Sequence, residues 1–433
     1  MCTTTNRATQ VASPAADKVR TIVKPPPVAV PLPGLFPAAF SLLDNNVAAG
    51  DPLLVAFGKI AAKAKYKRLP FAIIDYTSGT PAYLGNNDKK QTFVASQAKL
   101  GVLFAALWLR KTARENARKS AATDLAGVLN ELKTKWLQTD KPFPTRFKKN
   151  IIPSKTWPPN LADIFTGQFS NGEWKLDFTS GHDFRGAGRP ASLDFLIPFD
   201  KMSESGEAAK NAKKAAIGAL GFRERLELMT SWSDNIAAFS CVNALGYQFI
   251  NGSLEAAGFY NRDKTNGGGF WMSKNYDRLG GDGSDFQQVS PQSTTAQIAA
   301  NAMWLAVKNQ LIDQESSEDW MLMTEKAFYT SNPNPPAGGI QSLIGDELGS
   351  KQRLRIAQLN SKIGIFFDEK TTNGQKEYFN FHYSDTANVQ EDDPVKGRLK
   401  YIISICFSGD TDRTTAVLSS LAFELEKAIK QAH

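Results

Sequence analysis

Helical patterns of apolar residues dominate the middle of the chain. Residues 96–110 are apolar on nearly every side of a helix, which is typical of a helix buried in a protein core. Other helical patterns are found at 52–65, 221–230, 235–244, 294–311 and 415–431, the last of them amphipathic. We therefore predict a mainly helical middle part, with segment 96–110 at its centre.

Strand-like apolar runs lie towards both ends of the chain. Segments 69–76 and 81–84 flank a Thr-Ser-Gly-Thr turn and predict a β-hairpin. After the turn-rich stretch 333–339, further strand-like runs occur at 355–359, 364–367, 377–383 and 399–407. This order predicts an α+β fold, in which an antiparallel sheet built from both ends of the chain has flanking helices and a helical subdomain.

Composition narrows the class of protein. The 433 residues include 42% hydrophobic ones, which suffices for one large core. The net charge of +8 is spread along the chain without a basic stripe carrying interleaved aromatic residues, so nucleic-acid binding is not expected. No run of about 18 apolar residues predicts a membrane span.

The cysteines and the N-terminal residues bear on the compartment. The three cysteines are far apart, and no Cys/His cluster suggests a metal site. The first residues lack the apolar core of a secretory signal, which favours a cytoplasmic protein. Residues 1–48 are rich in proline and predict an extended arm before a domain that covers 49–433.

The scarcity of histidine limits the possible chemistry. The chain has three histidines and no Gly-x-Ser-x-Gly motif, so a Ser-His-Asp hydrolase is not favoured and lysine is the available base. Ser96-Gln-Ala-Lys99 places a serine and a lysine on one face at the start of the buried helix. Burial would lower the lysine pKa from about 10.4 towards neutrality. The alternative is a helix-capping serine beside a lysine that reaches solvent.

Two further short motifs follow along the chain. Ser233-Asp234-Asn235 precedes a predicted helix, and Lys362-Ile-Gly364 lies in a predicted strand. Each also has a structural interpretation, as a capping turn between two helices and as an edge-strand lysine that deters aggregation.

Together the three motifs resemble the serine β-lactamase and penicillin-binding protein family, most closely its class A branch. That family has Ser-x-x-Lys, Ser-Asp-Asn and Lys-Thr-Gly in this chain order. The resemblance covers about 50–112 and 219–433. It implies a β-lactamase/transpeptidase-like fold and acyl transfer to a serine, without a metal or an organic cofactor.

The resemblance also implies roles for individual residues. Ser96 would be the acylated nucleophile and Lys99 its base, while Ser233 would relay a proton to the leaving group. Asn235 would bind substrate or Lys99. The remaining implied roles belong to the strand, where Lys362 would attract a substrate carboxylate, Gly364 would complete the binding strand, and the amide of Ile365 would form an oxyanion hole with that of Ser96.

Three departures from the family pattern change the expected function. Ile363 replaces the usual hydroxyl residue of the third motif. Region 261–293 has no glutamate to activate water for deacylation, although it contains Asp263, Asp277, Asp282 and Asp285. Ser96 and Ser233 lie 137 positions apart, which predicts an inserted lid at about 111–218.

The sequence therefore predicts a serine hydrolase that forms a Ser96 acyl-enzyme with an ester, amide or β-lactam and turns over classical β-lactams poorly. The partner is a small carbonyl substrate. An esterase or acyltransferase remains an alternative within enzymes. A non-catalytic ligand-binding protein that retains the fold is the alternative from another class.

Overall fold

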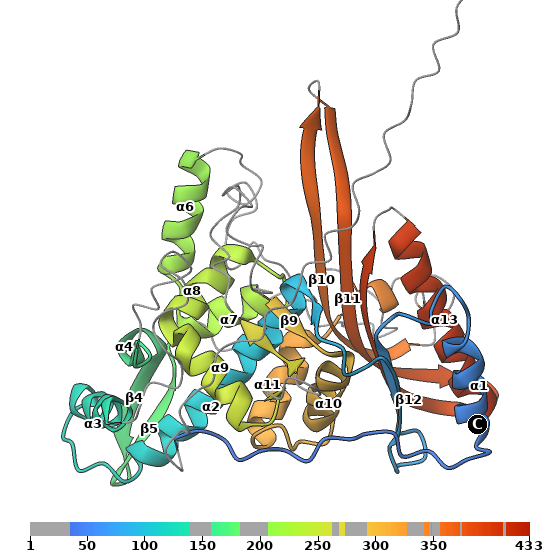
Figure 1. Cartoon of the computed structure of the whole chain (residues 1–433). Helices are drawn as coiled ribbons and strands as arrows, with labels where there is room; N and C mark the ends of the chain where they lie inside the picture. Colours follow the sequence, from blue (N-terminus) through green and yellow to red (C-terminus); the bar gives the residue numbers. More distant parts are fainter. Residues whose placement is uncertain are drawn as a thin grey trace, which may run out of the picture.

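The computed structural model describes residues 35–138, 157–181, 207–261, 268–272, 292–326, 342–345, 348, 356–372, 375–409 and 413–433. A five-stranded sheet forms one side of the molecule, and most helices are gathered on its other side (Figure 1). The predicted α+β class is confirmed. Among the described residues, no helix has the length and apolar character needed to cross a bilayer.

The sheet is built from both ends of the chain, as predicted. Its order is β10-β11-β12-β1-β2, and every neighbouring pair is antiparallel. The strands are β1 (Phe71–Asp75), β2 (Ala82–Asn86), β10 (Ile356–Thr372), β11 (Gln375–Asp393) and β12 (Gly397–Gly409). Strand β10 is an edge strand in this order, and the β10–β11 hairpin extends well beyond the other strands (Figure 1).

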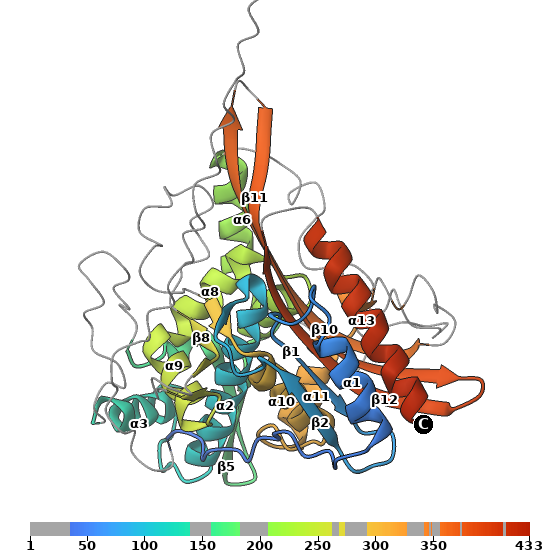
Figure 2. The same cartoon turned by 45° about the vertical axis from the view of Figure 1, so that its right-hand side comes forward.

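Both faces of the sheet are covered, because apolar residues of the central strands alternate between two cores. Phe71 and Ile73 of β1 face a core shared with α1 (Pro52–Ala61) and α13 (Arg413–Ala432). Ala72 and Ile74 belong to the larger core of the helical part. Helices α1 and α13 lie against one another on the outer face of the sheet (Figure 2).

The helical part surrounds a central helix, α2 (Lys99–Ala117), which continues from the 3-10 helix η1 (Ala95–Ala98). The residues of α2 are buried on all sides over its first three turns, as the apolar pattern predicted. Helix α2 contacts α7 (Phe222–Thr230), α8 (Asn235–Leu245), α9 (Tyr247–Ala256) and α11 (Gln314–Thr324), and α10 (Ala296–Val307) packs against α11 and the sheet.

Short strands fix the segment that leads into η1. Strand β3 (Thr92–Phe93) pairs with β9 (Gln292–Thr294), which also pairs with β8 (Trp271–Met272). A separate pair joins β6 (Tyr260–Asn261) and β7 (Gly268–Gly269). The described end of the N-terminal arm, residues 35–48, runs along the helices, where the amide of Leu43 donates to Asn301 over 2.6 Å.

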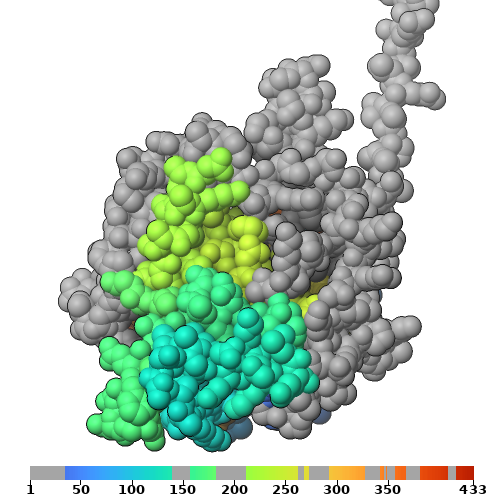
Figure 3. All heavy atoms as spheres, turned by 90° about the vertical axis from the view of Figure 1, so that its left-hand side faces the viewer, coloured from blue at the N-terminus to red at the C-terminus, as the bar shows by residue number. Residues whose placement is uncertain are grey.

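The described parts of the 111–218 insertion lie on one face of the molecule (Figure 3). They comprise α3 (Leu125–Leu137), α4 (Leu161–Ile164), β4 (Phe165–Ser170), β5 (Glu173–Phe178) and α6 (Glu207–Gly218). Strand β5 packs beside the C-terminal half of α2, where Arg114 donates to the Leu176 carbonyl over 2.7 Å. Helix α6 instead contacts α8. The lid stays a prediction. Helix α6 bears on it because α8, which α6 contacts, begins at the Ser233-Asp234-Asn235 motif.

Gly364 joins the sheet to the helical part by a very close approach. A Cβ at this position would lie 1.9 Å from the Val94 carbonyl oxygen and 2.8 Å from the Gln97 amide nitrogen. The turn that carries Ser96 therefore fits against β10 only if residue 364 has no side chain.

We predict that Gly364→Ala lowers the midpoint of thermal unfolding, because overpacking typically costs about 1–3 kcal/mol. The matched control is Gly58→Ala in α1, where a Cβ would meet nothing within 4 Å. That variant should unfold at the same temperature as the wild type or slightly above it. Equal midpoints for Gly364→Ala and the wild type would show that the turn yields freely.

Candidate active site

The three sequence motifs meet where η1 and α2, the turn before α8, and β10 come together. The Nζ of Lys99 donates to the Ser233 carbonyl over 2.5 Å and to the Asn235 Oδ1 over 2.8 Å. The Nζ of Lys362 donates to the Ser233 hydroxyl over 2.7 Å. Segments separated by more than a hundred positions thus supply one compact polar cluster.

Ser96 lies in η1, directly before α2, and its side chain is half-buried. The preceding residue, Ala95, has a φ of +46°, in the left-handed region that non-glycine residues seldom adopt. Such backbone strain persists only where the surroundings impose it, and it gathers at functional sites. Lys99 follows one turn later and is fully buried.

Several contacts hold the η1 turn in this conformation. The Val94 amide donates to the Gln292 carbonyl over 2.9 Å. The Val94 carbonyl accepts from the Ser384 hydroxyl over 2.9 Å, and the Gln97 side-chain amide donates to Thr386 over 2.5 Å. Two of these partners belong to β11, so the sheet itself fixes the turn.

The second motif caps a helix and also faces Lys99. Asp234 is the N-cap of α8, since its Oδ1 accepts from the Ala237 amide over 2.8 Å. Ser233 has a φ of +58°, and both its carbonyl and its hydroxyl lie near the Nζ of Lys99. The interpretation as a capping turn is therefore confirmed, and the functional interpretation of this turn stays a prediction.

Burial sets the charge state of the two lysines. Loss of hydration lowers the pKa of Lys99 to about 7, although the negative charge of Asp234 acts in the opposite direction. Burial also lowers the pKa of Lys362 far below its usual range, and the positive charges of Lys99 and Lys326 add to that effect. Near neutral pH a substantial share of Lys99 is therefore the free amine, which can accept a proton.

The hydroxyl of Ser233 lies between these two amines. Its Oγ is 2.7 Å from the Nζ of Lys362 and 3.3 Å from that of Lys99. A hydroxyl can donate one hydrogen bond while accepting others. This arrangement can pass a proton between the two lysines through Ser233.

The third motif lies along the edge strand beside the Ser96 turn. Gly364 packs against Val94 and Gln97, and Ile365, which follows it, has a side chain 39% exposed. Ile363, which replaces the usual hydroxyl residue, is only 4% exposed. The amides of Ser96 and Ile365 as oxyanion donors stay a prediction.

Sequence reasoning missed a third buried lysine. Lys326, which follows α11, is 1% exposed, and its Nζ donates to the Ser231 carbonyl over 3.2 Å. Its amide donates to the Leu359 carbonyl on β10 over 2.8 Å. Nothing in the local sequence distinguishes this lysine from one on the surface, because its burial depends on distant segments.

A buried carboxyl group behind β10 was missed as well. Asp385 on β11 is fully buried and accepts from Ser361 and Ser342 over 2.6 and 2.8 Å and from the Ile344 amide over 3.0 Å. Burial raises its pKa despite these bonds. Its charge acts on both Lys326 and Lys362, so it belongs to the electrostatics of the site.

Two other expectations concern water activation and metals. The four aspartates at 263, 277, 282 and 285 lie outside the described residues. Within the ranges that the structure describes, no group of three or more His, Cys, Asp and Glu side chains is placed to hold a metal ion.

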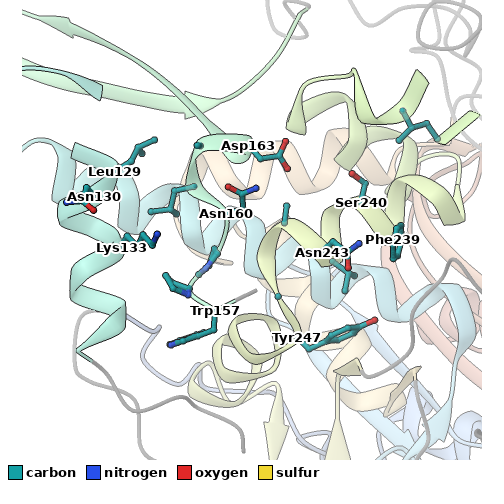
Figure 4. Close-up of a pocket in the computed structure, with 18 of the residues that line it drawn as sticks. Leu129, Asn130, Lys133, Trp157, Asn160, Asp163, Phe239, Ser240, Asn243 and Tyr247 are labelled. Atoms are coloured by element: carbon teal, nitrogen blue, oxygen red, sulfur yellow. The ribbon is translucent and has the colours of Figure 1, made fainter. Parts of the chain in front are cut away.

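A groove of about 970 Å³ lies beside this site, between α3, α4, α6 and α8 (Figure 4). Trp157, Phe239 and Tyr247 line it together with Asn160 and Asn243. None of the described residues that line it belongs to the three motifs. The groove is therefore separate from the cluster of the three motifs.

No protein-family model matches the sequence, and no curated protein matches it. Solved structures of class A β-lactamases are similar to this structure. The enzyme from Bacteroides cellulosilyticus DSM 14838 is 12% identical, with a TM-score of 0.42, over 87% of this chain and 98% of that one. The enzyme from Mycobacterium abscessus is 10% identical, with a TM-score of 0.43, over 88% and 100%.

A protein named PBP-A is 10% identical, with a TM-score of 0.40, over 90% of this chain and 99% of that one. These similarities concern the fold alone.

We predict that Lys99 titrates near pH 7. NMR of the protein labelled with 13C-lysine should show a resonance with this midpoint, and Lys99→Met should remove it. Lys89→Met, which removes an exposed lysine paired with Asp44, should leave the resonance in place. The burial argument is wrong if every lysine titrates above about pH 9, close to a free lysine.

Proposed function

We propose that this chain is a serine hydrolase that acts by acyl transfer through Ser96, with Lys99 as the base. The observation that carries the proposal is the convergence of two buried amines on Ser233, one turn from a half-buried serine. Desolvating an amine is costly, and stability alone gives no reason to place two of them together. Lysines with strongly lowered pKa values beside a nucleophilic side chain are typical of enzymes that catalyse acyl transfer.

Acylation follows from these positions. The free amine of Lys99 takes the hydroxyl proton of Ser96 while the Ser96 oxygen forms a bond to the substrate carbonyl carbon. The carbonyl π electrons move onto its oxygen, which becomes an oxyanion. The amides of Ser96 and Ile365 donate to that oxygen, and one such donor typically contributes about 3–4 kcal/mol to the transition state.

Collapse of this intermediate breaks the bond to the leaving group. The leaving group takes the proton of the Ser233 hydroxyl, and the Lys99 ammonium returns a proton to Ser233 over their 3.3 Å contact. Lys362 holds the Ser233 oxygen throughout and stabilises its transient negative charge. The acyl-enzyme thus forms with Lys99 neutral again.

Deacylation requires a base that aims water at the ester. Lys99, once neutral, can take a proton from water as it took one from Ser96. A leaving group that departs frees the space for this water. The leaving amine of an opened β-lactam stays attached to the acyl group, so it competes for the same space.

The site favours a neutral acyl group over an anionic one. Lys362 is 1% exposed, and both Ser233 and the Ile363 carbonyl accept hydrogen bonds from it. Ile363 offers no hydroxyl to a substrate carboxylate. We therefore propose small esters as the substrate class that fits best, ahead of amides and β-lactams.

The nucleophile is tested by covalent labelling. A fluorophosphonate should add once, to the peptide that contains Ser96, and Ser96→Ala should abolish the adduct. Lys99→Arg should also abolish it, because a guanidinium stays protonated. Circular dichroism of both variants checks that they fold. Undiminished labelling of Ser96→Ala would disprove the assignment, and a wild type that is never labelled would favour a non-catalytic binding protein.

Turnover is tested by a time course with a penicillin, a cephalosporin and a nitrophenyl ester. We predict a long-lived acyl-enzyme with any β-lactam that reacts, visible by mass spectrometry as an adduct of the intact drug. The ester should be hydrolysed over many cycles because its leaving group departs. Rapid steady-state hydrolysis of penicillin without a burst would contradict this and would require a deacylating base other than Lys99.

A further inference from the structure

Helix α6, in the region that interrupts the family pattern, makes an ionic contact with the second motif. The Nζ of Lys213 lies 2.6 Å from the Oδ2 of Asp234. Their side chains are 20% and 14% exposed, so the pair is largely shielded from water. Helices α6 and α8 are also in contact along this region.

Asp234 has little freedom once this contact is made. Its Oδ1 accepts from the Ala237 amide over 2.8 Å, so its two oxygens are divided between the α8 N-terminus and Lys213. Its own amide donates to the Leu228 carbonyl over 3.0 Å. The carboxylate, the α7–α8 turn and α6 are thereby joined at one residue.

Asp234 lies between the two residues that bind Lys99. Ser233 supplies its carbonyl and Asn235 its Oδ1 to the Lys99 ammonium, and both orientations depend on the turn that Asp234 holds. A shift of this turn would move the acceptors of Lys99 and the hydroxyl that receives Lys362.

We propose that Lys213 is a positioning residue of the active site, which acts through Asp234 to hold Ser233 and Asn235 against Lys99. This inference rests on the proposed function. Under it, α6 is a working part of the site. Lys213 holds the turn that carries Ser233, so a substitution of Lys213 alters the rate of the reaction although this residue does not contact the substrate.

The positive charge of Lys213 also supports the proposed role, through its effect on the protonation of Lys99. Burial lowers the pKa of Lys99, while Asp234 and Cys241 raise it, and the charge of Lys99 in turn lowers the pKa of Lys362 on β10. Lys213 balances the negative charge of Asp234. Its removal leaves that charge less compensated, which favours the protonated form of Lys99. The fraction of free amine at neutral pH then falls, so the pH at which Ser96 reacts half-maximally rises.

The experiment compares Lys213→Gln, Lys213→Arg and Lys214→Gln. Lys214 is the next residue on α6 and lines the separate groove, so it matches Lys213 in helix position and charge. For each variant the rate of fluorophosphonate labelling at Ser96 is measured from pH 5 to 10, together with the midpoint of thermal unfolding. The NMR titration of Lys99 supplies a readout that does not need Ser96 to react.

Lys213→Gln should move both pH midpoints upward by about half a unit to one unit and slow labelling at pH 7 about two- to sixfold. Lys213→Arg should restore the wild-type profile, and Lys214→Gln should keep it. A profile of Lys213→Gln that superimposes on the wild type overturns the inference, whether or not its unfolding midpoint falls. An equal shift in Lys214→Gln also overturns it.

The two proposals fail in different ways. If wild-type Ser96 is never labelled but Lys213→Gln still shifts the titration of Lys99, the hydrolase proposal is wrong and the positioning role stands. If Ser96 is labelled and the titration of Lys99 is unmoved in Lys213→Gln, the positioning role is wrong and the hydrolase proposal stands.

Discussion

The burial of Lys99 beside Ser233 is the interaction on which the rest of the site depends. An ammonium group removed from water must find acceptors or lose its proton. The chain does both, because Ser233 and Asn235 supply acceptors while the pKa of Lys99 falls to about 7. To present those acceptors, the turn before α8 takes a left-handed residue at Ser233 and a capping carboxylate at Asp234. The turn that caps α8 thus also supplies the acceptors of the buried amine.

The sheet makes this arrangement possible because it joins the two ends of the chain. β10 brings Lys362 to Ser233 from one side, and β11 supplies the Ser384 and Thr386 hydroxyls that fix the η1 turn from the other. Because Gly364 has no side chain, β10 and the η1 turn can lie in contact. A strand, a 3-10 turn and a helix cap therefore hold each other in place, and none of them is set by its local sequence alone.

Whether a feature could be predicted from the sequence depends on how far apart along the chain the interacting residues lie. The alternation that sends Phe71 to one core and Ala72 to the other is local, so the strands and their arrangement from both chain ends were predicted. The buried pattern of α2 is local in the same way. Lys326 and Lys213 owe their roles to partners about a hundred and about twenty positions away, and no local pattern marks them. The motifs were found because each is short, while their contacts required the fold.

The charges of the cluster have to be considered together. The positive charge of Lys99 lowers the pKa of Lys362, so the protonation of Lys362 depends on that of Lys99. Two carboxyl groups act in the opposite direction. Asp234 on the α8 turn raises the pKa of Lys99, and Asp385 on β11 raises that of Lys362. A substrate carboxylate beside these amines would raise both pKa values and remove the free base that acylation needs. A neutral carbonyl compound leaves the balance intact. Under the proposed function, the same electrostatics that prepare Lys99 to accept a proton would select against an anionic acyl group, and the hydrocarbon at Ile363 would act in the same sense.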